Sequence, residues 1–254
     1  MNPSLFSQCQ SYLVAHAVSA PFEAEKGQRR AVTISREAGA GAITVGELAM
    51  EYLENKRAGD PRYPWALFDR QLVKKVLKDH QLPESFEQYM PEDSTDKVSD
   101  LVEDMLGLHP STFTLVQHTN RTIFRLGLAG NVILVGRGSN LVTARLKHVL
   151  HVRLVAPLEA RIRHIGEYYH FDQQRAAEFV RKADKAKARY IRSNFKRRED
   201  DPTQFHLTIN TGMVSFPEAA RMIGDAVLNM QNESPEPEAR PANLIPKRVD
   251  VAMV

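Results

Sequence analysis

Five short apolar segments, separated by amphipathic ones, constrain the fold of this chain more than any other feature of its sequence. None of the five alternates cleanly between apolar and polar residues, which is typical of parallel strands buried on both faces of a sheet. They are residues 31–35, 65–69, 131–135, 149–155 and 205–210. Helical patterns occupy residues 44–57, 70–80, 94–106, 112–129, 157–169, 173–197 and 216–231. This order predicts an α/β fold, a parallel sheet flanked by helices on both faces and connected by right-handed crossovers.

The two ends of the chain differ from this middle part. Residues 1–29 carry a short apolar pattern that Pro21 interrupts, so we expect an N-terminal helical extension. From residue 232 onward, four prolines and many charges predict an extended Pro-rich tail in residues 232–254. The main domain is therefore expected to span residues 30–231. Either end is a candidate contact for a homo-oligomer, since both contain apolar residues.

Composition limits the class of protein. The 254 residues include 43% hydrophobic ones, enough for a sizeable core, and the net charge is only +3. A single cysteine excludes an internal disulfide and a cysteine-based metal cage. No run approaches the roughly 18 consecutive apolar residues of a membrane-spanning helix, and the chain does not open with a secretory signal pattern. We therefore expect a cytoplasmic protein without a membrane partner.

The stretch "AVTISREAGAGAITVGELAMEYL" (residues 31–53) has the layout of a phosphate-binding P-loop, a strand followed by small residues and a helix. Gly39, Ala40, Gly41 and Ala42 would let backbone N–H groups approach phosphate oxygens at a helix N-terminus. Ile43 and Thr44 continue this loop, and the Thr44 hydroxyl is the candidate ligand of Mg²⁺. Arg36 stands where the motif has its first glycine, and Ala42 where it has its lysine. The alternative is a tight strand-to-helix turn without a ligand.

Two further candidate sites follow later strands. Gly136 and Arg137 come directly after the apolar run 131–135, and ligands of open parallel sheets bind beyond the carboxyl ends of the strands. A guanidinium there can hold a phosphate with two hydrogen bonds, although capping of a neighbouring helix is the alternative. Asp69 ends the second strand, where a carboxylate could hold Mg²⁺ or orient an acceptor hydroxyl.

The segment 181–198 holds nine lysines or arginines and one aspartate in eighteen residues. Three interpretations stay open for this segment. It can be a solvated helix face, a nucleic-acid patch, or a lid whose cations close over a transferring phosphoryl group. Only Tyr190 and Phe195 interleave the charges, so nucleic acid is the weakest of the three.

Taken together, these features resemble the cytidylate kinase-like family of P-loop proteins. The likeness runs from about residue 30 to 230 and rests on the order of six stretches: "TISREAGAG", "FDRQL", "VILVGRGSN", "LHVRLVAPLEARI", "DKAKARYIRSNF" and "LTINT". The chain departs from true cytidylate kinases at Ala42, which replaces the loop lysine, and at Gly138, which replaces an aspartate that reads cytosine. The pair Ser35–Arg36 that opens the loop is similar to the variant in the cytidylate kinase-like family.

The resemblance implies a P-loop NTPase-like fold with a basic helical lid, and a kinase that uses ATP and Mg²⁺. Arg36, Thr44 and the loop amides would hold the donor, with Arg36 replacing the missing lysine. Asp69, Gly136 and Arg137 would bind a nucleotide or another small phosphorylated acceptor. Lys185, Arg189 and Arg192 lie in the region that matches the lid, and residues 210–212 lie near the expected donor base. A pseudokinase that senses nucleotide or acts as a scaffold, and a nucleic-acid-binding module, are the alternatives.

Overall fold

The computed structural model describes residues 29–56, 58, 64–69, 113–136 and 138–230. Along this part of the chain, strands and helices alternate. The strands are β1 (Ala31–Arg36), β2 (Ala66–Phe68), β3 (Val132–Val135), β4 (Val149–Val155) and β5 (Leu207–Asn210). The helices are α2 (Ala42–Asn55), α5 (Phe113–Ala129), α6 (Ser139–Val142), α7 (Leu158–Tyr169), α8 (Gln173–Phe195) and α9 (Phe216–Asn229), with a 3₁₀ turn, η2 (Pro202–Gln204).

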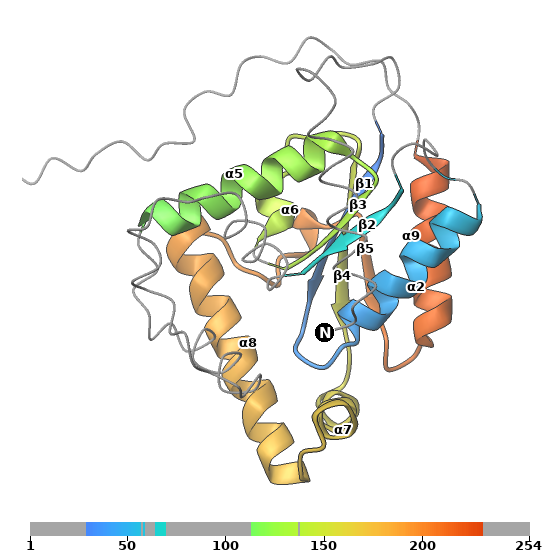
Figure 1. Cartoon of the computed structure of the whole chain (residues 1–254). Helices are drawn as coiled ribbons and strands as arrows, with labels where there is room; N and C mark the ends of the chain where they lie inside the picture. The colour runs from blue at the N-terminus through green and yellow to red at the C-terminus, as the bar shows by residue number, and fades with distance from the viewer. Residues whose placement is uncertain (1–28, 57, 59–63, 70–112, 137, 231–254) are drawn as a thin grey trace, which may run out of the picture.

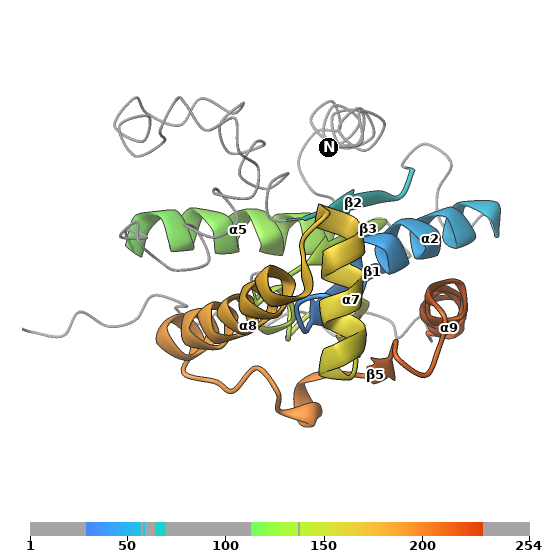
Figure 2. The ribbon, with the colours of Figure 1, turned by 90° about the horizontal axis from the view of Figure 1, so that it is seen from below.

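The five strands form one parallel sheet in the order β2-β3-β1-β4-β5. The first strand of the chain lies at its centre, because Ala31 pairs with Val132 of β3 on one side and with Val149 of β4 on the other. Helices cover both faces, with α2 and α9 on one side and α5 and α8 on the other (Figures 1 and 2). The predicted α/β fold with a parallel sheet flanked by helices on both faces is therefore confirmed.

The two faces of the sheet are packed differently. On the α2 and α9 face, the side chains are apolar and fully buried, as at Val32, Ile34 and Leu154. On the other face, apolar packing against α5 covers only part of the sheet. The rest of that face carries buried polar side chains from β1 and β4, namely Thr33, His151 and Arg153. These buried polar side chains of β1 and β4 therefore lie on the side of the sheet that α8 covers (Figure 2).

Helices α7 and α8 follow each other at the carboxyl end of the sheet, and Figure 1 views α7 along its axis while α8 runs across the page. Apolar residues such as Ile165, Phe179 and Val180 pack between them. Helix α8 begins where the Asp172 side chain accepts the backbone N–H of Arg175 at 2.7 Å, and it ends at Lys196 with a left-handed φ of 55°. This pair brings a long charged helix to the end of the sheet where the glycine loop lies.

The predicted strands all exist, with ends that differ by at most two residues. Helix α2 begins at Ala42 rather than at residue 44, because Gly41 is its N-cap. The short α6 was not predicted, since four residues show no periodicity. The helices predicted at 70–80 and 94–106, the extension over residues 1–28 and the tail from 232 lie outside the described residues, so the domain boundaries stay predictions. Within the described part, no helix has the length and apolarity to cross a membrane.

Candidate phosphate-binding site

The loop between β1 and α2 has a backbone that only small residues allow. Gly39 and Gly41 adopt positive φ angles of 85° and 77°, where side chains are strained. Space is also lacking, because a Cβ on Gly39 would lie 2.5 Å from the carbonyl oxygen of Arg161. A Cβ on Gly41 would lie 2.3 Å from the ring of Phe216. The glycines predicted from the sequence are therefore required by the loop itself.

This loop presents backbone donors that the described protein does not use. In the described residues, no hydrogen-bond acceptor contacts the backbone N–H groups of Gly39, Gly41, Ala42, Ile43 and Thr44. Helix α2 also has no side-chain cap at Gly41 and no acidic residue in its first turn. A helix N-terminus carries partial positive charge, so free N–H groups there favour an anion. The loop thus fits a phosphate group.

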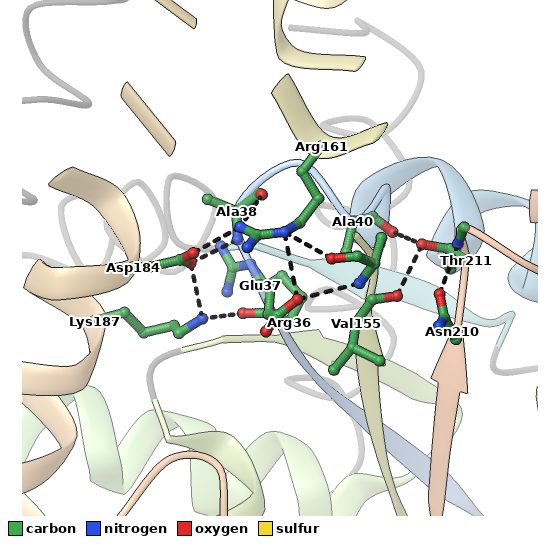
Figure 3. Close-up of polar contacts among 12 residues, drawn as sticks. Arg36, Glu37, Ala38, Ala40, Val155, Arg161, Asp184, Lys187, Asn210 and Thr211 are labelled. Atoms are coloured by element: carbon green, nitrogen blue, oxygen red, sulfur yellow. Dashed lines mark hydrogen bonds and ion pairs between the residues drawn. The ribbon is translucent and has the colours of Figure 1, made fainter. Parts of the chain in front are cut away.

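Arg161 of α7 fixes the loop from one side (Figure 3). Its guanidinium donates to the carbonyl oxygens of Ala156 at 2.9 Å and Ala38 at 3.2 Å. Its Nε also lies 3.4 Å from the Glu37 carboxylate, which accepts the backbone N–H of Ala156 at 3.1 Å. Only 9% of Arg161 is exposed. The start of the loop is therefore tied to the connection between β4 and α7.

Helix α8 fixes the loop from a second side. The Asp184 carboxylate accepts the backbone N–H of Ala38 at 2.8 Å and a guanidinium N–H of Arg161 at 2.7 Å. One turn further, the Lys187 ammonium donates to the carbonyl oxygen of Arg36. That ammonium also lies 3.5 Å from carboxylate oxygens of Asp184 and Glu199. Figure 3 shows both side chains reaching from α8 to the first residues of the loop.

These charges are buried enough to change protonation equilibria. Burial lowers the pKa of Lys187, and the Glu199 and Asp184 carboxylates oppose this change. Burial likewise raises the pKa of Glu199, against the opposing effect of Lys187 and Arg153. Arg153, 6% exposed, donates to the carbonyl oxygen of Glu199 at 2.5 Å. Each charge in this cluster therefore depends on its neighbours, as expected where water screens poorly.

The turn after β5 contacts the loop from a third side. The Thr211 hydroxyl donates to the carbonyl oxygen of Ala40 at 3.1 Å, and Asn210 closes the turn by accepting the backbone N–H of Gly212 at 3.0 Å. Next to it, Phe216 lies against Gly41 and meets His164 edge to face at 5.2 Å. Residues 210–212 thus lie beside the loop between β1 and α2, and their expected place near the donor base stays a prediction.

The remaining predicted site residues fall into different environments. The Arg36 side chain extends toward the end of β3, since a Cβ on Gly136 would lie 1.9 Å from its guanidinium. Asp69 follows β2 and is half-buried. Lys185, Arg189 and Arg192 are exposed on α8, and Arg137 lies outside the described residues. The structure thus brings Arg36 and Gly136 together, while the three α8 cations face solvent.

Sequence reasoning missed Glu37, Arg161, Asp184 and Lys187 as residues that contact the loop. The sequence contained a signal for two of these residues, Asp184 and Lys187. Asp184 is the lone acid of the basic run, and it stands three residues before Lys187, so both lie on one helix face. Arg161 and Glu37 had no local signal, because their contacts join segments more than a hundred residues apart.

The residues also allow a test of the implied Mg²⁺. Among the residues that the structure describes, no group of three or more His, Cys, Asp or Glu side chains could hold a metal by itself. Mg²⁺ usually retains waters and binds through one or two protein oxygens together with substrate phosphates. Thr44 and Asp69 are both half-buried, and they stay the predicted protein ligands of Mg²⁺.

Comparison with known proteins gives a family model and a fold. The model described as "Cytidylate kinase-like family" matches residues 31–213. A search of curated proteins found no match. The solved structure of an uncharacterized protein from Eubacterium ventriosum aligns with a TM-score of 0.58 and 15% identity, covering 79% of this chain and 99% of that chain. Shikimate kinase from Acinetobacter baumannii, solved with shikimate, aligns with a TM-score of 0.44 and 14% identity, covering 82% and 97%.

Proposed function

The chain belongs to the cytidylate kinase-like family, and from this premise we propose that it transfers the γ-phosphoryl group of ATP to a nucleoside monophosphate-like acceptor. The observation that carries the proposal is the set of five unpaired backbone N–H groups from Gly39 to Thr44. They lie at the N-terminus of α2, where an anion is favoured. A structural turn without a ligand would leave these donors unused.

The residues around the loop suggest a division of roles. The loop amides bind and orient the phosphates of the donor, and Arg161 with Asp184 keeps the loop in its binding conformation. Arg36, beside Gly136, lies toward the end of β3, where Arg137 is the proposed ligand of the acceptor phosphate. Phosphoryl transfer needs little covalent chemistry from the protein, so positioning and charge neutralisation account for catalysis. Bound Mg²⁺ would neutralise charge on the donor phosphates, with Thr44 and Asp69 as its protein ligands.

Lys185, Arg189 and Arg192 are proposed to act only when an acceptor is bound. All three are exposed, so their ammonium and guanidinium groups are available to a transferring phosphoryl group if α8 bends over the site. In the described arrangement, Asp184 and Lys187 rather than these three contact the loop.

A second candidate function is a nucleotide-binding pseudokinase. The observation in its favour is Ala42, which is 6% exposed and packed in the apolar core where the P-loop motif has a lysine. Such a protein would bind ATP·Mg²⁺ through the same loop without transferring phosphate.

One experiment separates the two functions. The protein is incubated with γ-labelled ATP, Mg²⁺ and each nucleoside monophosphate in turn, and label transfer is measured beside the melting temperature of the same samples. We expect label on one or more acceptors and a higher melting temperature with ATP·Mg²⁺, since a ligand that binds only the folded state stabilises it. A higher melting temperature without transfer to any acceptor would support the pseudokinase. Absence of both would contradict the phosphate site.

A nucleic-acid-binding role is tested by salt. Polyanion binding to the exposed cations of α8 would weaken steeply as salt rises, because counterions are released on binding. We expect the protein not to bind single-stranded or duplex RNA at physiological salt.

A further inference from the structure

The loop lacks its own cation, and the structure limits where a replacement can come from. Ala42 is buried in the apolar core, so its position supplies no charge. The guanidinium of Arg36 is turned toward Gly136 at the end of β3. Lys185, Arg189 and Arg192 lie on the solvent side of α8. A cation that contacts the loop itself must therefore be sought on another residue.

We propose that Lys187 of α8 supplies to the donor phosphates the positive charge that the loop lysine supplies in other P-loop proteins. This inference rests on the proposed function, and it assigns a phosphate-binding role to a residue outside the loop. The ammonium contacts the carbonyl oxygen of Arg36, the residue at which the loop begins.

The partners of Lys187 leave room for a phosphate oxygen. An ammonium has three N–H donors. One N–H of Lys187 is used by the carbonyl oxygen of Arg36, whereas the contacts with Asp184 and Glu199 are long, at 3.5 Å each. Both carboxylates also have closer partners or opposing charges of their own, as Asp184 does in Ala38 and Arg161. A phosphate oxygen could displace the Asp184 contact without isolating that acid, whereas the buried Oε2 of Glu199 has no hydrogen-bond partner and would keep only the nearby charge of Arg153.

Burial makes this charge effective. Lys187 is about one-fifth exposed, and Coulomb attraction to a phosphate is stronger where water is partly excluded. Burial also lowers the pKa of Lys187, and a bound phosphate would oppose that effect by favouring the ammonium form. The exposed cations of the same helix attract a phosphate through water and salt, which screen and weaken that attraction.

The position of Lys187 is fixed by the contact next to it. Asp184 lies one helical turn earlier and holds the backbone N–H of Ala38 at 2.8 Å. The same face of α8 therefore holds Ala38, the third residue of the loop, and presents an ammonium to the first, Arg36 (Figure 3). Such a cation needs no rearrangement when the donor binds, a condition that favours stabilisation of charge in a transition state.

The test compares Lys187→Met with Lys182→Met in the full chain. Lys182 is a matched control, because it lies on the same helix but is 47% exposed and pairs with Glu178 on the surface. We expect Lys187→Met to weaken binding of ATP·Mg²⁺ by at least about tenfold, roughly 1.4 kcal/mol, and to slow phosphoryl transfer by roughly 10²–10³. Lys182→Met should keep both values, and Lys187→Arg should recover part of the loss because it retains the charge.

A second variant keeps the test valid if Lys187→Met folds less stably. If Lys187→Met lowers the melting temperature without ligand, Lys187→Met/Glu199→Gln removes the counter-charge together with the ammonium and is measured instead.

The outcomes separate this inference from the proposed function. If the unaltered protein neither binds ATP·Mg²⁺ nor transfers phosphate, the proposed function fails and the role of Lys187 fails with it. If the unaltered protein binds ATP·Mg²⁺ and Lys187→Met binds it equally well, the proposed function stands and the role of Lys187 is overturned. A lower melting temperature with unchanged ATP affinity would likewise reduce Lys187 to a structural residue.

Discussion

Arg161 makes four polar contacts from a side chain that is 9% exposed, with Ala156, Ala38, Asp184 and Glu37. We expect Arg161→Met to lower the free energy of unfolding by about 3–5 kcal/mol, because it leaves Glu37 without its ion pair and Asp184 with only the longer contact to Lys187. Urea unfolding measures this loss. Arg163→Met, at an exposed position of the same helix, is the control and should stay within about 0.5 kcal/mol of the parent. An equal free energy of unfolding for Arg161→Met and the parent would show that the loop does not depend on this side chain.

A second prediction for a single residue concerns Arg36, and it is about the rate of phosphoryl transfer rather than about stability. Its guanidinium lies beside Gly136, between the phosphate loop and the end of β3. A cation that acts on charge developing during transfer changes rate more than ground-state binding. We therefore expect Arg36→Ala to slow phosphoryl transfer by roughly 10²–10³ while ATP affinity changes less.

The alternative for Arg36 is a structural role. A variant that melts earlier, yet keeps its specific activity when assayed well below its melting temperature, would establish that alternative. Arg36→Lys adds a further comparison, since it keeps the charge but loses the planar fork of donors.

Among the elements, β1 and β4 share a buried polar pair that should respond to pH. His151 of β4 is 7% exposed, contacts the Thr33 hydroxyl of β1 at 2.8 Å and lies beside the ring of His206, which precedes β5. Burial, followed by His206, lowers the pKa of His151 to about 4.

Between pH 6.5 and 4 the unfolded chain therefore binds more protons at this position than the folded chain, and stability falls as pH falls. We expect His151 to account for a loss of up to about 3 kcal/mol across that interval. Urea unfolding at pH 7, 6 and 5 measures the slope, and His151→Gln should reduce it. Identical slopes for the two proteins would exclude His151 as the cause.

The elements also show what sequence patterns can and cannot predict. The strands were predictable, because runs such as "VILV" and "VLHVRLV" are apolar and bounded by turn residues. The tight loop between β1 and α2 was predictable from Gly39 and Gly41, since both positions demand glycine on backbone grounds, whereas phosphate binding there stays a prediction. Which face of α8 meets the loop was not predictable, because cations occur all round that helix. Only the fold shows that Asp184 and Lys187 face inward while Lys185 and Arg189 face outward.

For the whole molecule, the two ends of the described domain are joined to each other. The Arg30 guanidinium donates to the carbonyl oxygens of Val227 at 2.6 Å and Leu228 at 2.9 Å, and also to that of Met230. Both apolar clusters on the sheet also lie between residues 31 and 230. The domain boundaries at residues 30 and 231 stay predictions, which a truncated chain can test.

We therefore expect a chain of residues 29–231 to unfold cooperatively, with a melting temperature within about 4 °C of the full chain, equivalent to roughly 1 kcal/mol at this size. Calorimetry measures the transition, and light scattering on both chains shows whether the removed ends hold a second copy. A truncated chain that aggregates or melts without cooperativity would contradict these boundaries.

The central place of β1 has a consequence for synthesis. Ala31 pairs only with residues that follow it by a hundred positions or more, Val132 in β3 and Val149 in β4. A ribosome that adds about 5–20 residues each second needs roughly 5–20 s to make the first of these partners. During that interval the strand segment β1 has been made, but neither of its two edges has a partner strand. Parallel pairing of distant segments is also slow in itself. The first strand to be made is thus among the last to be protected, and it is the segment that a holding chaperone would have to cover.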